Sequence, residues 1–241
     1  MRIDILTLFP EMVDHALSES MIGRGREAGL LDIRCHNIRD YTLDKRRRTD
    51  DYPYGGGPGM IMQCDPLYRC LTDVTEEQKV HTILLSPRGK TFNQQKAREL
   101  LEMGRFVLVC GHYEGVDQRF IDACVDEELS IGDFVLTGGE LGACIVADAV
   151  GRMVPGVLAE SASFEEESHY SGLLEFPQYT RPEVWHDMPV PEVLLSGHHG
   201  NVEKWRRKKS LELTRDRRPD LFEKIELTKQ DKKLLESDEL K

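Results

Sequence analysis

Three glycine-rich turns are the parts of this sequence whose residue types and spacing could do chemistry. Residues 54–60 (YGGGPGM) hold four glycines in five positions, residues 111–117 (GHYEGVD) set polar residues between two glycines, and residues 130–140 (SIGDFVLTGGE) place an apolar stretch between glycines. Glycine lets the backbone turn sharply and come close to a ligand. In the third turn, bare backbone N–H and C=O groups would stand beside apolar side chains, which suits a small planar molecule with polar edges. Residues 130–140 therefore predict a ligand-binding loop.

The second turn directly follows residues 105–110 (RFVLVC), an apolar run of the kind that forms a buried parallel strand. Open α/β sheets bind ligands at the carboxyl ends of their strands, so this position favours a binding site. The glycine spacing is not G-x-G-x-x-G, and no P-loop lysine follows. The turn therefore gives no support for a dinucleotide or nucleoside triphosphate site.

Alternating strand-like and helix-like segments must position these turns. Short apolar runs predict buried strands, and apolar positions with a period near 3.6 predict helices. The predicted strands are residues 2–9, 30–38, 81–86 and 105–110; the predicted helices are residues 93–103, which stop at Gly104, residues 139–153, and one that starts at Pro10. Strands that alternate with helices are typical of an α/β fold with a parallel sheet.

After Pro155 the periodic pattern is lost, and residues 159–169 are mostly small, acidic or hydroxyl-bearing. This composition is typical of a linker or lid. Helical patterns return at residues 202–214 and 227–236 and are separated near Pro219. We therefore predict a catalytic α/β domain over residues 1–158, a flexible linker or lid over 159–172, and an all-helical domain over 173–241.

Composition limits the class of protein. The net charge of −11 argues against a purely electrostatic nucleic-acid binder, yet the basic runs 45–48 (KRRR) and 204–209 (KWRRKK) could contact phosphates. The 6 cysteines include no C-x-x-C pair, which disfavours a zinc cluster or a disulfide framework. The N-terminus lacks the pattern of a signal peptide, and no apolar run approaches the roughly 20 residues that span a bilayer. We expect a cytoplasmic protein with no membrane partner.

Five motifs in order resemble the bacterial tRNA (guanine-N1)-methyltransferases of the SPOUT family. They are residues 54–60, 111–117, 131–140, 179–184 (YTRPEV) and 195–199 (LSGHH), and the match extends from residues 8–12 (LFPEM) to residues 217–219. The resemblance implies a SPOUT-type parallel sheet with a deep trefoil knot, which periodicity alone does not indicate, and a small C-terminal helical domain. It further implies a homodimer with active sites at the subunit interface. The implied reaction is the S-adenosylmethionine-dependent methylation of N1 of the guanosine immediately 3′ of the anticodon in tRNA.

By the same resemblance, the knot loops hold the methyl donor. The residues that match the family's cofactor positions are Leu85, Ser86, Pro87, Gly111, Tyr113, Glu114, Ser130, Ile131, Gly132, Asp133, Phe134, Val135, Leu136, Gly138 and Gly139. Guanine N1 carries a proton that must leave before this nitrogen can accept a methyl group. The family's base is an aspartate in the acidic linker, and Glu167 occupies the matching position. Arg152 matches an arginine that would stabilise negative charge on guanine O6.

Other implications of the resemblance concern metal and RNA. Magnesium dependence is implied by the resemblance only, because the sequence shows no metal-ligand spacing, and we assign no residue to a metal. Basic side chains contact phosphates and aromatic ones stack on bases. The candidate tRNA-binding residues are Arg46, Arg47, Gly55, Gly56, Gly57, His198, Trp205 and Arg206.

Two alternative functions stay open at this point. One is a SPOUT-fold RNA-binding protein with altered or lost methyl transfer, and glutamate in place of aspartate at position 167 is the feature that favours it. The other is a SPOUT enzyme that methylates a different position, such as the ribose 2′ oxygen. The acidic linker and the helical C-terminal region favour the guanine-N1 reaction.

Overall fold

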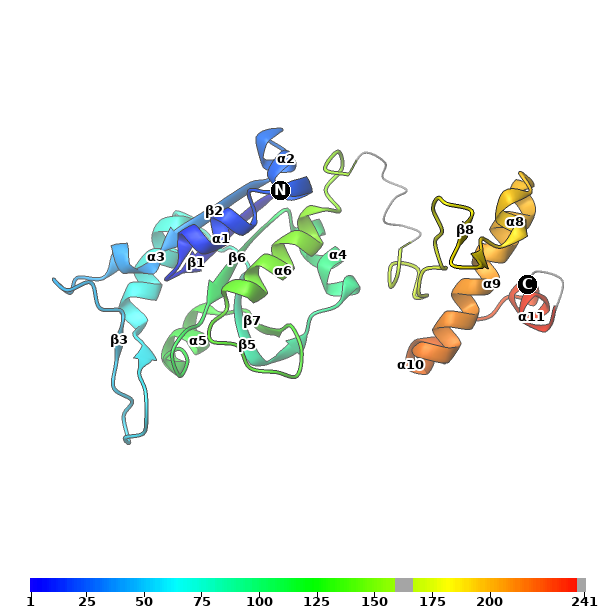
Figure 1. Cartoon of the computed structure of the whole chain (residues 1–241). Coiled ribbons are helices and arrows are strands. Elements are labelled where there is room, and N and C mark those ends of the chain that lie inside the picture. Colours follow the sequence, from blue (N-terminus) through cyan, green and yellow to red (C-terminus); the bar gives the residue numbers. More distant parts are fainter. Residues whose placement is uncertain (159–166, 238–241) are drawn as a thin grey trace. The chain divides into compact units, whose positions relative to one another are not determined.

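A computed structural model describes residues 1–158 and 167–237 of the chain. The chain divides into two compact units, residues 1–161 and 162–241 (Figure 1). The predicted linker, residues 159–172, lies at this division, and its residues 159–166 fall outside the described ranges. None of the helices within the described ranges is long and apolar enough to cross a membrane.

The first unit is built on a five-stranded parallel sheet. Its strands are β1 (Arg2–Thr7), β2 (Asp32–Asn37), β5 (Thr82–Thr91), β6 (Arg105–Cys110) and β7 (Glu127–Ser130), in the spatial order β2-β1-β6-β5-β7. Every neighbouring pair runs parallel. The predicted α/β class with a parallel sheet is therefore confirmed. Because the strands are parallel, the carboxyl ends of β5, β6 and β7 lie at the same edge of the sheet.

Helices cover both faces of this sheet (Figure 1). On one face, α6 (Glu140–Gly151) contacts β1 and β6, and α1 (Pro10–Ala16), α2 (Ser20–Glu27) and α4 (Gln94–Met103) pack beside it. On the other face, α3 (Cys64–Thr75) and α5 (Gln118–Cys124) share a hydrophobic core with the strands. The short helix η1 (Ile38–Tyr41) and the hairpin of β3 (Asp50–Asp51) and β4 (Ile61–Met62) lead from β2 to α3.

Strand β5 is longer than the sequence predicts. The apolar run predicts a strand over residues 81–86, whereas β5 runs from Thr82 to Thr91. Its pairing with β7 is interrupted after Leu85 and resumes at Lys90, so that residues 86–89 bulge out of the sheet. A Cβ on Gly89 would lie 2.4 Å from the backbone nitrogen of Leu129, so only glycine fits where the two strands meet. The extension is polar, which hides it from a search for apolar runs.

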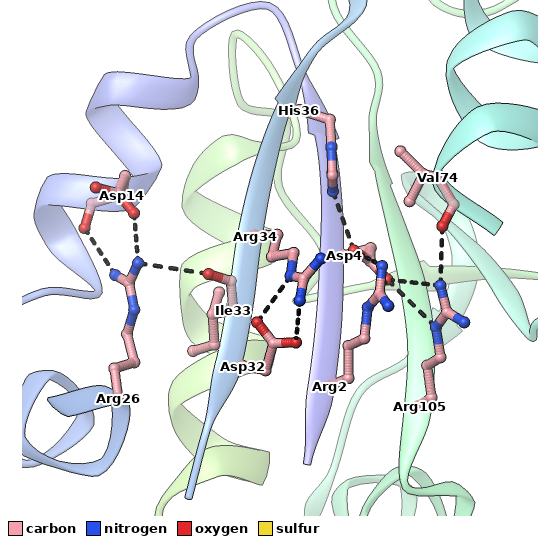
Figure 2. A network of polar contacts seen from close by, with 10 residues as sticks. All are labelled: Arg2, Asp4, Asp14, Arg26, Asp32, Ile33, Arg34, His36, Val74 and Arg105. Carbon is pink, nitrogen blue, oxygen red and sulfur yellow. Dashed lines mark hydrogen bonds and ion pairs between the residues drawn. The ribbon is translucent and has the colours of Figure 1, made fainter. Parts of the chain in front are cut away.

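A buried carboxylate joins three strands of the sheet. Asp4 has no exposed surface; Arg2 Nε donates to its Oδ2 at 2.9 Å, and His36 Nε2 lies 3.0 Å from its Oδ1 (Figure 2). Arg105 Nη2 approaches Oδ2 at 3.3 Å from β6. Burial alone would raise the pKa of Asp4, but the hydrogen bonds from His36 and Arg2 outweigh it and hold that pKa below its ordinary value.

The second unit is organised around α9 (His199–Arg217). The short helices α8 (Glu192–Leu195) and α10 (Pro219–Phe222) and the helix α11 (Lys229–Glu236) pack against it. An ion pair of 2.8 Å between Arg207 and Asp231 links α9 to α11. The helices predicted over residues 202–214 and 227–236 are therefore present.

The prediction that the second unit is all-helical is wrong in one detail. Strands β8 (Val184–Trp185) and β9 (Met188–Pro189) pair as an antiparallel hairpin. The two residues between them, His186 and Asp187, have left-handed φ values of 48° and 60°. Two consecutive left-handed residues make the tight turn that fits the twist of a hairpin, and so short a segment shows no period in the sequence.

Candidate functional site

A cavity of about 360 Å³ lies at the carboxyl ends of β5, β6 and β7. Three segments supply most of its lining: residues 84–88 in the first half and bulge of β5, residues 111–116 after β6, and residues 129–131 and 134–139 from the end of β7 to the start of α6. Small-molecule sites in proteins have volumes of roughly 300–1,000 Å³. The cavity therefore has the size and the position of a ligand site in an α/β sheet.

The loop between β7 and α6 closes the cavity by returning to the end of β6. The backbone N–H of Gly139 donates to the carbonyl of Gly111 at 2.8 Å, and His112 pairs with Gly138 in an antiparallel bridge. A Cβ on Gly139 would lie 2.8 Å from the Cα of Cys110, closer than real Cβ atoms come. Glycine is therefore required at position 139 for the loop to lie against β6.

Polar contacts hold the wall behind this loop. Glu140 is buried at the first turn of α6 and accepts a hydrogen bond of 2.8 Å from the Thr7 hydroxyl. His112 Nδ1 lies 3.7 Å from Glu140 Oε2, and the His112 ring packs on Phe9 with centroids 5.0 Å apart. A carboxylate at a helix N-terminus is also favoured by the helix dipole. Together these contacts fix the end of β1, the turn after β6 and the start of α6 to one another.

The thiols near the cavity are not suited to nucleophilic chemistry. Burial raises the pKa of the Cys110 thiol well above its ordinary value, so this thiol stays protonated. The 6 cysteines are all free. Across residues 1–158 and 167–237, no cluster of three or more His, Cys, Asp or Glu side chains could hold a metal ion.

Most of the predicted cofactor residues meet at this cavity. The predicted residues that line it are Leu85, Ser86, Pro87, Gly111, Tyr113, Glu114, Ser130, Ile131, Phe134, Val135, Leu136, Gly138 and Gly139. Gly132 and Asp133 belong to the same loop but do not line the cavity. The structure adds residues that the prediction missed: Leu84, Arg88, His112, Gly115, Val116, Ile121, Leu129, Thr137 and Gly142. His112 and Thr137 lie inside the glycine-rich turns, which is a signal that could have found them, whereas Leu84, Ile121 and Leu129 read as ordinary core residues.

Known proteins are similar to this chain over nearly its whole length. The family model described as tRNA (Guanine-1)-methyltransferase TrmD matches residues 1–224. The chain belongs to this family. A tRNA (guanine-N(1)-)-methyltransferase of Clostridium acetobutylicum is 54% identical over 240 residues, which cover 100% of this chain and 98% of the relative. Proteins of the same name are 56% identical over 236 residues in Clostridium novyi, covering 98% and 97%, and 52% identical over 243 residues in Alkaliphilus oremlandii, covering 98% of each.

In this member of the tRNA (guanine-1)-methyltransferase family, the two predicted catalytic residues lie in different units. Arg152 is half-buried and directly follows α6 in the first unit, whereas the half-buried Glu167 belongs to the second unit. The start of α6 borders the cavity, since Gly139 and Gly142 line it. A helix of 12 residues rises about 18 Å, so Arg152 lies at the far end of α6 from the cavity of its own chain.

The predicted RNA-binding residues of the family member are exposed, with one exception. Arg46 and Arg47 lie in the loop after η1, and residues 55–57 form the exposed turn of the β3–β4 hairpin. In the second unit, the exposed His198 precedes α9 and its Nδ1 accepts from the N–H of Asn201 at 3.4 Å. The exposed Arg206 places its guanidinium 4.8 Å from the Phe176 ring centre.

The exception is Trp205, whose predicted role in stacking on a base does not fit its position. Its side chain is 1% exposed and lies on the inner face of α9, with its ring centre 6.2 Å from that of Tyr179. An indole on a basic helix can point inward as easily as outward, and the run 204–209 does not distinguish the two. Trp185, in the β8–β9 hairpin, is the exposed tryptophan of the second unit at 60%.

Proposed function

We propose that this chain methylates N1 of the guanosine immediately 3′ of the anticodon in tRNA, with S-adenosylmethionine as the methyl donor. The observation that carries the proposal is the convergence of the family's cofactor positions on one cavity at the carboxyl ends of β5, β6 and β7. Relatives that are more than half identical over nearly the full chain bear the name of this activity. The chain is accordingly an enzyme, a tRNA (guanine-N1)-methyltransferase.

The residues of the cavity fit S-adenosylmethionine. Leu85, Phe134 and Leu136 offer apolar surface for a flat heterocycle, and the backbone of residues 130–139 offers hydrogen-bonding groups for its edge. The carboxylate of Glu114 offers an acceptor for an ammonium group. A Cβ at Gly138 would collide with His112 and Glu140, and one at Gly139 with Cys110, so these glycines let the loop lie close to the end of β6. When bound, S-adenosylmethionine supplies a methyl group activated by its sulfonium centre.

The chain's own residues must then move a proton and stabilise charge. Glu167 removes the proton from guanine N1, so that the nitrogen lone pair becomes available to the methyl group. The electrons left behind spread onto O6, where the guanidinium of Arg152 stabilises the negative charge by charge-assisted hydrogen bonds. The support for both assignments is their match to the family's motif positions.

The position of Arg152 supports a homodimer with active sites at the subunit interface. Because Arg152 and the cavity lie at opposite ends of α6, an active site that combines them would take the cavity from one chain and the arginine from a second copy. Leu141 and Ile145 lie one turn apart on α6 and are about half exposed, as are Phe9 and Met12 of the neighbouring α1 region. Exposed apolar side chains on two neighbouring segments support an interface with a second copy of the chain.

Charged residues on this face should therefore separate the two subunits. We expect the double variant Leu141→Glu/Ile145→Glu to raise the dissociation constant of the dimer by at least about a hundredfold, because association would bury unpaired carboxylates. Analytical ultracentrifugation over a concentration series measures it. Tyr68→Glu, at an exposed aromatic residue of α3 on the opposite face of the sheet, is the matched control and should associate like the wild type. A double variant that also associates like the wild type would place the interface elsewhere.

The proposal also includes the trefoil knot and a tRNA-binding second unit. The path of the chain from the edge strand β7 back to the end of β6 supports the knot, and a crystal structure traced through residues 127–151 tests it. The basic, exposed Arg206 and the polar start of α9 at His198 support tRNA binding by the second unit. Arg46, Arg47 and the exposed turn at residues 55–57 would contact tRNA from the first unit.

The proposed reaction is tested by locating the methyl group on the product. We expect the chain, given S-adenosylmethionine and an unmodified tRNA transcript, to form 1-methylguanosine 3′ of the anticodon, as read by mass spectrometry of nuclease fragments. Gly139→Ala should weaken donor binding by at least about tenfold, roughly 1.4 kcal/mol, because the added methyl group displaces the loop from Cys110. Isothermal titration calorimetry with S-adenosylmethionine measures this loss.

A second glycine substitution is the control for donor binding, and two results would contradict the proposed reaction. Gly200→Ala adds the same methyl group in α9, where the nearest atom lies 3.6 Å away, and should leave donor binding unchanged. A methyl group found on a ribose oxygen would make the guanine-N1 assignment wrong. Binding of tRNA without any methyl transfer would instead identify a non-catalytic RNA-binding protein.

A further inference from the structure

Arg39 joins the arginine-rich loop after η1 to the wall of the cavity. Its Nη2 donates to the hydroxyl of Tyr113 at 3.1 Å, and its Nη1 donates to the carbonyl of Arg47 at 3.4 Å. A second hydrogen bond runs in the opposite direction, because Arg47 Nε donates to the carbonyl of Arg39 at 3.4 Å. The guanidinium of Arg39 therefore contacts both the loop backbone and a cavity residue, and both contacts are exposed to solvent.

Tyr113, at the inner end of this bridge, is a residue that needs to be held in place. It lines the cavity, yet its φ of 59° is left-handed, a conformation that residues with a side chain adopt at a cost in free energy. Its ring packs edge-on against His112, with centroids 5.1 Å apart. The N–H of the next residue, Glu114, donates to the carbonyl of Met60 at 3.0 Å. The hydrogen bond from Arg39 holds the hydroxyl end of Tyr113.

The outer end of the bridge is only weakly fixed by the chain itself. Arg47 pairs with Asp40, and both side chains are more than half exposed. Arg48 pairs with Asp44 at 3.1 Å, and the arginine is 65% exposed. Exposed ion pairs contribute little to stability, so phosphate groups can compete for these arginines. A polyanion bound to the loop would order the loop, and with it the carbonyl of Arg47 that receives Arg39.

We propose that Arg39 is a positioning residue that couples tRNA binding at the arginine-rich loop to cofactor binding at Tyr113. The inference rests on the proposed function. A ligand in the cavity orders Tyr113 and, through Arg39, the loop; tRNA on the loop orders the same bridge from the other end. Whichever ligand binds first meets the entropy cost of ordering the bridge, so the second ligand binds without that cost. Each ligand therefore tightens the binding of the other, and thermodynamic linkage makes the two factors equal.

The coupling is measured with S-adenosylhomocysteine, which carries no transferable methyl group, and an unmodified tRNA transcript. Isothermal titration calorimetry gives the dissociation constant of S-adenosylhomocysteine with and without saturating tRNA, and the ratio of the two is the coupling factor. For the wild type we expect a factor of about five or more. We expect Arg39→Met and Tyr113→Phe each to bring it close to one, and the double variant to add nothing further, because both remove the same hydrogen bond.

Three further variants separate positioning from charge. Arg39→Lys keeps the positive charge but replaces the two separate nitrogens of the guanidinium by one, which cannot take both of their positions. Its coupling factor should therefore fall, while its tRNA affinity at each salt concentration stays near that of the wild type. Arg46→Ala should weaken tRNA binding and flatten its salt dependence, yet keep the coupling factor. Arg34→Met removes an exposed arginine that pairs with Asp32 and should change neither quantity.

The outcomes distinguish this inference from the function on which it rests. If the wild type transfers no methyl group and binds no tRNA, the proposed function is wrong and the inference fails with it. If the wild type methylates tRNA but Arg39→Met, Arg39→Lys and Tyr113→Phe keep the wild-type coupling factor, the inference alone is overturned. A wild-type factor of one in an active enzyme overturns it in the same way.

Discussion

Replacing Glu167 by glutamine is expected to lower the rate of methyl transfer by about 10²–10⁴-fold, the usual contribution of a general base. The amide has the size of the carboxylate but cannot accept the proton of guanine N1. Because the lost interaction belongs to the proton transfer, the dissociation constants of tRNA and S-adenosylmethionine should change by less than about threefold. Single-turnover kinetics with both ligands saturating measure the chemical step directly.

The neighbouring glutamate provides the matched control for this substitution. Glu166→Gln makes the same chemical change one residue earlier in the acidic run and should leave the single-turnover rate near that of the wild type. If Glu167→Gln also keeps the wild-type rate, the assignment of the base is wrong. Glu114, which lines the cavity, would then be the next carboxylate to test.

Replacing Asp4 by asparagine is expected to lower the free energy of unfolding of the first unit by about 3 kcal/mol at pH 7. Removing one partner of a buried ion pair costs about 3–5 kcal/mol, because the remaining charge is left without compensation. The lower end of this range applies, since the side chains of Arg2 and Arg105 each keep 24% of their surface exposed. Urea unfolding of the full chain, followed by circular dichroism, measures the change.

The effect of Asp4 should depend on pH in a defined direction. Because the pKa of Asp4 is lowered in the folded protein, its carboxylate stabilises the fold above the ordinary carboxyl pKa of about 3.9. This stabilisation is lost as the pH falls through the lower pKa of the folded state. The difference between wild type and Asp4→Asn should therefore be complete at neutral pH and shrink below about pH 4.

An exposed ion pair on β2 provides the control for Asp4. Asp32 contacts Arg34 at 2.8 Å, with 47% and 54% of the two side chains exposed. Asp32→Asn should therefore cost less than about 1 kcal/mol. If Asp4→Asn lowers the free energy of unfolding no more than Asp32→Asn does, the buried contacts of Asp4 do not stabilise the sheet as proposed.

Most of the fold could be predicted where the signal is local. The run 105–110 is apolar on both faces and forms β6 with the predicted bounds, and Asn93 and Gly104 cap α4 at the predicted ends. Strand β7 is missed because it begins with two glutamates at the edge of the sheet. In the folded chain Glu127 lies 2.7 Å from both Lys96 and His81, residues that are distant in sequence. An acidic edge strand of this kind looks like a loop until its partners are known.

The turns around Gly111 and Gly139 and the loop at residues 130–140, which lines the cavity, follow from the sequence by itself, because glycine marks places where the backbone must bend or approach closely. The α/β class also follows, because the periods of strands and helices are properties of short segments. Only the tertiary structure decided which residues meet. Thr7 and Glu140 are 133 positions apart and share a buried hydrogen bond, Trp205 turns inward, and Arg39 reaches Tyr113. Burial and side-chain pairing depend on contacts between distant segments, which no local pattern encodes.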